Sequence, residues 1–231
     1  MARPGTIDGS SNADETLTGK NGANTFHFEA GTSGDDRITK SEATDVLALD
    51  RALYDRNKDR VIALGGHSVS LDGQGTGDKL AIDGVDALRF LGLDDAGHYI
   101  YADAGVRPRG AQESTLADDV FSGGSVGKKD VFFFDTTLGL SLGKDTIIKF
   151  DDRDSIVTTS KIMDGNQDGI ITGTSGTFKL DDSNGSLTLW NVDDSVVTAL
   201  KYDATFTHDD VSYYVYSTIA SASLDTNDLI F

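Results

Sequence analysis

Two short segments of the chain carry side-chain oxygens at alternate positions, an arrangement that suits a hard divalent cation. Residues 55–61 read Asp-Arg-Asn-Lys-Asp-Arg-Val, and residues 164–170 read Asp-Gly-Asn-Gln-Asp-Gly-Ile. Calcium takes about six to eight oxygen ligands, and a tight loop with Asp or Asn at its first, third and fifth positions directs three of them toward one point. We therefore expect each segment to bind Ca²⁺ through its acidic and amide side chains, which are those of Asp55, Asn57, Asp59, Asp164, Asn166 and Asp168.

The remaining calcium ligands must come from outside these positions. An EF-hand loop supplies a bidentate Glu at its twelfth position, but Gly66 and Ser175 stand there in this chain. The predicted additional ligands are two backbone carbonyls and two matched carboxylates, those of Val61, Ile170, Asp72 and Asp181. Gly169 suits the sharp turn at the sixth position, whereas Arg60 adds positive charge and a conformational cost, so the second loop should bind more tightly. Alternatively, the side chains only cap backbone amides in Asx turns.

The two loops belong to a longer internal repeat. They are 164 − 55 = 109 residues apart, and flanking segments match in unbroken order. The offset grows only from 117 − 13 = 104 at Ala13 to 214 − 99 = 115 at Tyr99. This register predicts a tandem duplication. The predicted organisation is a first β-rich calcium-binding repeat, a linker, a second such repeat and a C-terminal tail, at residues 1–104, 105–112, 113–217 and 218–231.

The elements expected to position the loops are β-strands. Apolar and polar residues alternate in short segments separated by Gly-rich or Asp-rich turns, for example at 69–71, 80–82, 88–90 and 99–101. The sequence therefore predicts an all-β fold of two tandem units, each ending in an antiparallel meander or sandwich. Little helix is expected, at most a turn or two in each half. The best helix candidate runs from Ser41 to Tyr54, with Ser41 as its cap.

Composition limits the classes of partner. The 231 residues suffice for one or two domains, and the absence of cysteine excludes disulfides and thiolate sites. With 38 acidic and 20 basic residues, the net charge is −18, which argues against nucleic acid as a partner and suits cation binding, although acidity also serves solubility. No apolar run approaches the length of a membrane span, and the N-terminus lacks the apolar stretch of a secretory signal peptide.

The glycine-rich start of each half resembles a known family. Residues 15–28 resemble the nonapeptide repeat of RTX (haemolysin-type calcium-binding) proteins, with Gly19, Gly22, Asn24 and Phe26 at its characteristic positions. The second half repeats this pattern with two extra residues and with Lys128-Lys129 inside it. The resemblance covers residues 9–50 and 117–157, and implies that each unit starts with a short β-roll-like segment that binds calcium, and not with a long β-roll. The other interpretation is a pair of glycine-rich turns that bind nothing.

The same resemblance implies a route of export. RTX proteins leave the cell by type I secretion, without an N-terminal signal peptide and with an uncleaved C-terminal signal. The last four residues, Asp228-Leu229-Ile230-Phe231, resemble such a signal, although they could also form a final strand. We therefore expect a secreted protein of the extracellular space or the cell surface.

Catalytic motifs are not evident. There is no zinc-protease, nucleophile-elbow or phosphate-loop pattern, and the 4 histidines are scattered, at His27, His67, His98 and His208. We predict a non-enzymatic structural protein of the cell surface or matrix that folds on Ca²⁺ and self-associates into a filament or array. The alternative is a calcium-dependent carbohydrate-binding adhesin that recognises surface polysaccharide, which exposed Trp190 or Tyr213 would favour. A polysaccharide-modifying enzyme is the third possibility.

Overall fold

The computed structural model describes residues 5–9, 11–29, 31, 34–66, 68–72, 77–180, 185–221 and 229. They form two units, one that ends at Val106 and one that begins at Arg107. Strands take 45% of the chain and helical turns 3%, which confirms the prediction of an all-β protein made of two similar units. The boundary falls inside residues 105–112, the predicted linker, although Gln112 already belongs to a strand.

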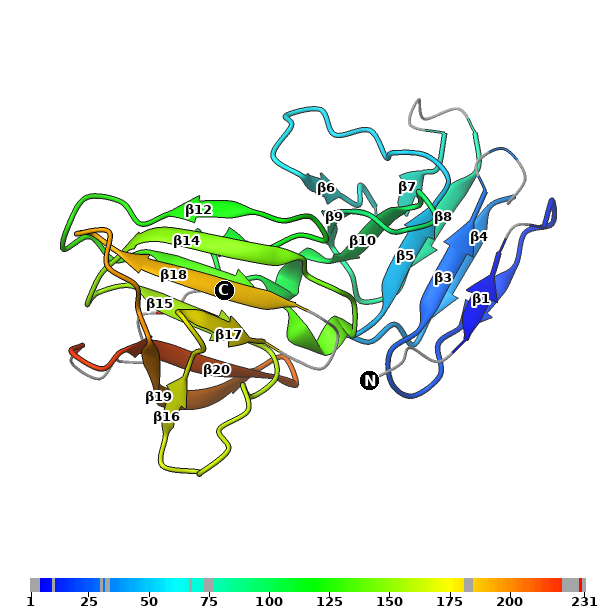
Figure 1. Cartoon of the computed structure of the whole chain (residues 1–231). Helices are drawn as coiled ribbons and strands as arrows, with labels where there is room; N and C mark the ends of the chain where they lie inside the picture. The colour runs from blue at the N-terminus through cyan, green and yellow to red at the C-terminus, as the bar shows by residue number, and fades with distance from the viewer. Residues whose placement is uncertain are drawn as a thin grey trace. The chain divides into compact units, whose positions relative to one another are not determined.

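The first unit contains two sheets (Figure 1). The larger sheet has the strand order β1-β3-β5-β10-β9-β6, and the smaller one the order β2-β4-β8-β7. In chain order, the strands are β1 (Thr6–Asp8), β2 (Thr16–Thr18), β3 (Thr25–Phe28), β4 (Asp36–Thr39), β5 (Val46–Leu49), β6 (Val61–Ala63), β7 (Ser68–Ser70), β8 (Lys79–Ile82), β9 (Ala87–Leu93) and β10 (Tyr99–Asp103), followed by the 3-10 turn η1 (Ala104–Val106).

The second unit repeats this arrangement strand for strand. Its larger sheet has the order β11-β13-β15-β20-β19-β16, and its smaller sheet the order β12-β14-β18-β17. Its elements are β11 (Gln112–Glu113), β12 (Val120–Ser122), β13 (Val131–Phe134), the 3-10 turn η2 (Thr136–Leu138), β14 (Lys144–Phe150), β15 (Ser155–Thr158), β16 (Ile170–Thr172), β17 (Thr177–Lys179), β18 (Ser186–Asn191), β19 (Ala199–His208) and β20 (Val211–Thr218).

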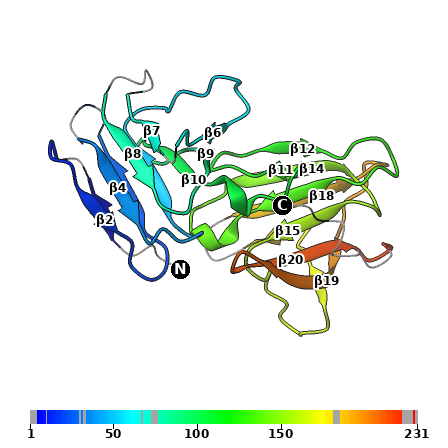
Figure 2. The same cartoon turned by 180° about the vertical axis from the view of Figure 1, so that it is seen from behind.

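Each unit starts as a parallel coil that passes alternately between its two sheets. In the first unit, β1, β3 and β5 pair in parallel in the larger sheet, while β2 and β4 pair in parallel in the smaller one, as Figure 2 shows from behind. Successive turns place apolar residues in line, because Ile7 pairs with Phe26 and Phe26 with Leu47. This is the β-roll-like start that the glycine-rich repeats predict.

The later part of each unit is only partly a meander. β9 and β10 pair antiparallel, and so do β7 and β8, as the alternating segments predict. β8, however, rejoins the coil and pairs in parallel with β4. The counterpart β18 does the same with β14 in the second unit. The smaller sheets therefore continue the parallel coil, because the apolar faces of β8 and β18 complete the core that the coil begins.

The predicted helix from Ser41 to Tyr54 is wrong. This segment contains β5, whose four residues are all buried, and β5 lies between β3 and β10. A strand buried on both faces carries a continuous apolar run, which periodicity alone does not distinguish from a helix. The two 3-10 turns, of 3 residues each, are the only helices in the described part of the chain, and no helix there could cross a bilayer.

The cores of the two units differ at the position of Phe150. In the second unit, the ring of Phe150 is fully buried, with its centroid 6.0 Å from that of Phe132. The equivalent residue of the first unit is Ser41, because Asp36 in β4 and Asp145 in β14 occupy matched register positions, where they pair with Leu80 and Leu187. A partly open pocket of about 20 Å³ lies there, lined by Ser41, by the acidic residues Glu42, Asp45 and Asp103, and by core residues, and it has room for one water molecule.

Candidate functional site

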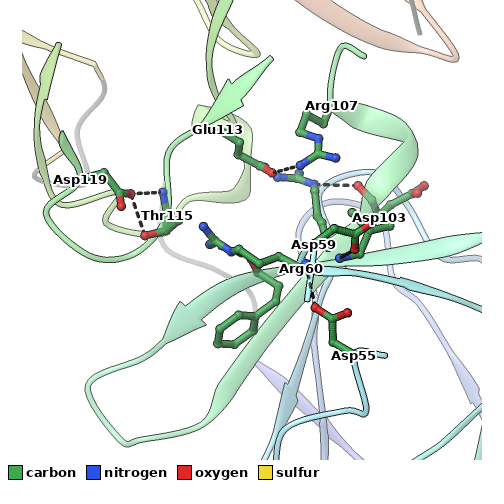
Figure 3. Close-up of polar contacts among 11 residues, drawn as sticks. Asp55, Asp59, Arg60, Asp103, Arg107, Glu113, Thr115 and Asp119 are labelled. Carbon is green, nitrogen blue, oxygen red and sulfur yellow. Dashed lines mark hydrogen bonds and ion pairs between the residues drawn. The ribbon is translucent and has the colours of Figure 1, made fainter. Parts of the chain in front are cut away.

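The predicted calcium loops lie just before the edge strands of the larger sheets. The first loop, residues 55–60, leads into β6, which pairs only with β9. Asp55 accepts hydrogen bonds from the backbone amides three and five residues later, at 2.7 and 2.8 Å. Asp59 accepts one from the amide of Val61 at 2.8 Å. Figure 3 draws Asp55 and Asp59. These bonds hold the loop in a tight turn.

The second loop has the same hydrogen bonds. Asp164 accepts bonds from the backbone amides three and five residues later, at 3.0 and 2.8 Å, and Asp168 accepts one from Ile170 at 2.8 Å. In both loops, the middle Asn donates its side-chain amide to the following Asp, at 2.7 Å from Asn57 and 2.9 Å from Asn166. The duplication has therefore kept the loop conformation as well as the sequence pattern.

The loops differ at their sixth position, as expected from Arg60 and Gly169. Both residues have a positive φ, of 68° and 82° respectively, which a glycine adopts without strain. The Arg60 guanidinium donates a 3.0 Å hydrogen bond to the carbonyl oxygen of Phe90 and lies 6.0 Å from the centroid of that ring. Phe90, in β9, thus interacts with the Arg60 charge, but the conformational cost of a positive φ at a residue other than glycine remains.

The structure supplies fewer acidic ligands than the sequence suggests. Asp72 follows β7 in the smaller sheet, where the Ser70 hydroxyl donates to its carboxylate. Asp181 lies outside the described residues. Within the described ranges, no three His, Cys, Asp or Glu side chains are arranged to hold a metal ion, so Asp72 does not join Asp55 and Asp59 in such a group. Each loop offers two carboxylates, one amide and one carbonyl, a set that leaves room for water ligands and fits weak Ca²⁺ binding.

The glycine-rich turn of the first unit is closed by a buried amide. Asn24 is fully buried, and its side-chain nitrogen donates to the carbonyl oxygens of Lys20 and Gly22 and to the carboxylate of Asp45, at 2.6, 2.8 and 2.8 Å. Three oxygens therefore converge on a single N–H₂ group. The group has two hydrogens for three oxygens, so at least one hydrogen is shared between two acceptors, and together these bonds close the turn.

The second unit replaces this amide with a carboxylate. Asp130 stands at the position of Asn24, and the Lys128 ammonium lies 3.4 Å from its carboxylate. The neighbouring Asp154 accepts hydrogen bonds from the amides of Asp130 and Asp151, both at 3.0 Å. Burial raises the pKa of Asp154 to about 6, and the charges of Asp151 and Asp130 add to this rise, against the hydrogen bonds from their amides. Lys128 thus pairs with the carboxylate that replaces the amide in this turn.

A second buried carboxyl recurs at the start of the small sheets, in Asp36 and Asp145. Ser114 donates its hydroxyl to Asp145 at 2.6 Å, whereas one oxygen of Asp36 is buried without a hydrogen-bond partner. Gly9 takes the place of Ser114 in the first unit, and a Cβ atom there would lie 2.2 Å from the ring of Phe28. Serine therefore does not fit. These buried carboxyls could have been found in the sequence, because an Asp stands at an inward-facing strand position in both halves of the repeat.

The histidines are less scattered than their spacing suggests. His27 in β3 and His98 before β10 have ring centroids 5.0 Å apart, nearly edge to face. Each Nδ1 atom faces a carboxylate, that of Asp8 at 3.4 Å and that of Asp94 at 3.0 Å. Strand pairing brings them together, because β3 and β10 both neighbour β5. His67 lies outside the described residues.

The two aromatic residues that bear on sugar binding behave differently. Trp190, at the end of β18, is 36% exposed. Tyr213, in β20, is fully buried and stacks on Phe206 with ring centroids 5.0 Å apart. Only Trp190 is therefore available to a ligand.

Comparison with known proteins adds no relative to these observations. No protein-family model, no curated protein and no solved structure matches the chain. The function must therefore be inferred from the residues and their geometry.

Proposed function

We propose that the protein is a secreted, calcium-binding, non-enzymatic structural protein of the cell surface or extracellular matrix. The observation that carries this proposal is the pair of matched loops, which keep the same oxygen spacing and the same backbone hydrogen bonds in both units. A turn that merely connects strands does not require Asp, Asn and Asp at the same three positions twice. Ca²⁺ is the proposed ligand because all the side chains that could bind it present oxygen.

Calcium would act by stabilising the folded form. The net charge of −18 makes the compact chain repel itself, and bound Ca²⁺ would offset part of this repulsion. An ion that binds only the folded state stabilises it by about 2.7 kcal/mol when its free concentration is a hundred times the dissociation constant. With so few protein ligands, each loop should have a dissociation constant on the order of 10⁻⁴–10⁻³ M, the range of extracellular calcium modules.

These affinities fit a protein that meets calcium outside the cell. A chain with weak sites would remain uncomplexed where free calcium is scarce, and would bind the ion after export. We therefore propose that the protein is secreted and that its folded units self-associate through their edge strands.

Isothermal titration calorimetry with CaCl₂ tests the assignment. We expect the double variants Asp55→Ala/Asp59→Ala and Asp164→Ala/Asp168→Ala each to lose one class of site. The matched control is Asp193→Ala, because Asp193 is exposed and also caps a turn, through bonds from the Ser195 amide at 3.0 Å and hydroxyl at 2.6 Å. If neither double variant changed Ca²⁺ binding, the loops would be Asx turns that do not bind the ion, and the proposal would be wrong.

The second candidate is a calcium-dependent carbohydrate-binding adhesin. The exposed Trp190 favours it, since an indole with an accessible face can stack on a sugar ring. The buried Tyr213 does not contribute. A glycan-binding screen with and without Ca²⁺ separates this candidate from a purely structural role.

A further inference from the structure

The smaller sheet of the second unit presents an outward face that its counterpart lacks. We call it the β14–β18 face, meaning the outward side chains of β12, β14, β18 and β17, centred on Thr146, Ile148, Thr188 and Trp190. Alternation places these side chains opposite the core residues Ile147 and Leu189, which are fully buried. Ile148 is 38% exposed, Trp190 36% and Val120, on β12, 74%. This sheet therefore offers apolar surface to a ligand.

The first unit closes the same place with an ion pair. Ile38 pairs with Ile82 there, and Ile147 pairs with Leu189 in the second unit, so Asp83 and Trp190 occupy equivalent positions. Arg37 donates two hydrogen bonds to Asp83, at 2.9 and 3.0 Å. In the second unit, Thr146 replaces Arg37. The ion pair of the first unit is thus replaced in the second unit by the Thr146 hydroxyl and the exposed indole of Trp190.

The charge of the face differs as well. Lys144 takes the place of Asp35, since both donate their backbone amides to the preceding turn of the coil, at 2.8 and 3.0 Å. Lys179 takes the place of Ser70. Lys179 pairs with Ser186 in the second unit, and Ser70 pairs with Lys79 at the same position of the first unit. The outward positions of these four second-unit strands include both lysines and no Asp or Glu. Lys144 and Lys179 thus place two positive charges on this face of a chain of net charge −18, and the Asp118 carboxylate lies beside Lys144, whose backbone amide donates to it at 2.8 Å.

The hydroxyl groups of the face form a row across the strands. Val120 pairs with Thr146, Thr146 with Thr188, and Thr188 with Thr177. The Thr188 and Thr177 hydroxyls are hydrogen-bonded to each other at 3.1 Å, so the pair keeps one hydroxyl hydrogen and its remaining lone pairs for a ligand. Lys144 and Ile148 are four residues apart on one strand, which places the lysine end roughly 13 Å from the tryptophan end.

We propose that the β14–β18 face binds a chain of acidic sugars. The indole of Trp190 would stack on one sugar ring, the threonine hydroxyls would bond to sugar hydroxyls, and Lys144 and Lys179 would pair with carboxylates further along the chain. A sugar chain matches all three features, whereas a simple anion would use only the lysines. This inference does not rest on the calcium loops, because no residue of either loop belongs to the face.

Fluorescence titration with tetragalacturonate tests the proposal. Trp190 is the only tryptophan of the chain, so its emission reports directly on this face. The titration is done in sodium buffer with and without Ca²⁺, which separates this site from the calcium sites. The double variant Lys144→Asp/Lys179→Ser gives the face the residues of the first unit, and should weaken binding at least about tenfold. Trp190→Ala should weaken binding to a similar extent, which calorimetry measures because this variant lacks the fluorescent side chain.

The matched control removes two charges from the equivalent face of the first unit. Arg37→Thr/Lys79→Ser should leave the affinity within about twofold, because those residues lie outside the β14–β18 face. The methyl-esterified tetramer, which lacks the carboxylate charges, should bind at least about tenfold more weakly than the acid. No emission change with tetragalacturonate, equal binding of the two tetramers, or equal losses in the control would overturn the proposal. Tighter binding of oligothymidylate would instead identify a nucleic-acid surface and also overturn it.

Discussion

Asp145 is a buried carboxyl whose protonation should control the stability of the second unit. It is 1% exposed, and it accepts hydrogen bonds from the Asp119 amide at 2.7 Å and from the Ser114 hydroxyl at 2.6 Å. Burial raises its pKa from 3.8 to about 7, and the charges of Asp119 and Asp118 add to this rise, against the two hydrogen bonds. The folded protein therefore holds a proton that the unfolded chain releases.

The sign and size of the effect follow from this difference. The stabilisation is fully present below pH 3.8, the ordinary pKa, and is lost as the pH rises through about 7. A rise from 3.8 to about 7 corresponds to about 4 kcal/mol of unfolding free energy. Asparagine mimics the protonated form, because its amide can donate to the Ser114 hydroxyl, which lies 3.3 Å from the Leu142 carbonyl oxygen and can donate to it. The advantage of Asp145→Asn should thus grow by about 4 kcal/mol between pH 4 and pH 8.

Urea unfolding followed by Trp190 fluorescence measures this advantage in the second unit. Series are recorded at constant sodium concentration without divalent cations, so that metal binding does not contribute. Asp152→Asn is the control, because Asp152 is exposed, and this variant should show no comparable growth. An advantage of Asp145→Asn that is the same at both pH values, or a variant that is less stable at the higher pH, would refute the reasoning.

Further substitutions test the packing and the loops. Phe150→Ala should destabilise the second unit by about 3–5 kcal/mol, whereas Ser41→Ala at the matched position should change the unfolding free energy by about 0.5 kcal/mol or less, both measured by urea unfolding. Asn24→Ala should lower the unfolding free energy by about 1–3 kcal/mol, because three acceptor oxygens lose their donor. Faster hydrogen exchange of the backbone amides in the turn would show this loss. Gly169→Arg, which copies the first loop into the second, should weaken Ca²⁺ binding about fivefold in calorimetry, because it adds a positive charge beside the ion.

Much of the fold could be predicted from the sequence because local patterns and the duplication agree. Alternation located strands such as β9 and β10, and the repeat predicted two similar units. β5 could not be predicted, because a strand buried on both faces loses its alternation, and residues from Ser41 to Tyr54 then resemble a helix. The parallel pairing of β8 with β4 joins residues far apart in the chain, which no local pattern reveals.

The candidate site was predictable only where its residues are close in sequence. The loops at Asp55 and Asp164 are local, so their oxygen spacing is visible directly. The face around Trp190 is assembled from four strands, and the closeness of His27 and His98 depends on strand order. The sequence could not reveal that one oxygen of Asp36 is without a hydrogen-bond partner. This follows from the neighbouring turn of the coil, where Gly9 provides no hydroxyl.

Calorimetric melting in excess chelator and in millimolar Ca²⁺, with light scattering alongside, tests the central claim most directly. The account predicts a higher melting temperature in calcium, because the ion binds only the folded form. This rise should shrink in the Asp164→Ala/Asp168→Ala variant, and particles should grow in the wild type if the units assemble. Identical melting of the wild type in the two buffers would contradict calcium binding by both loops.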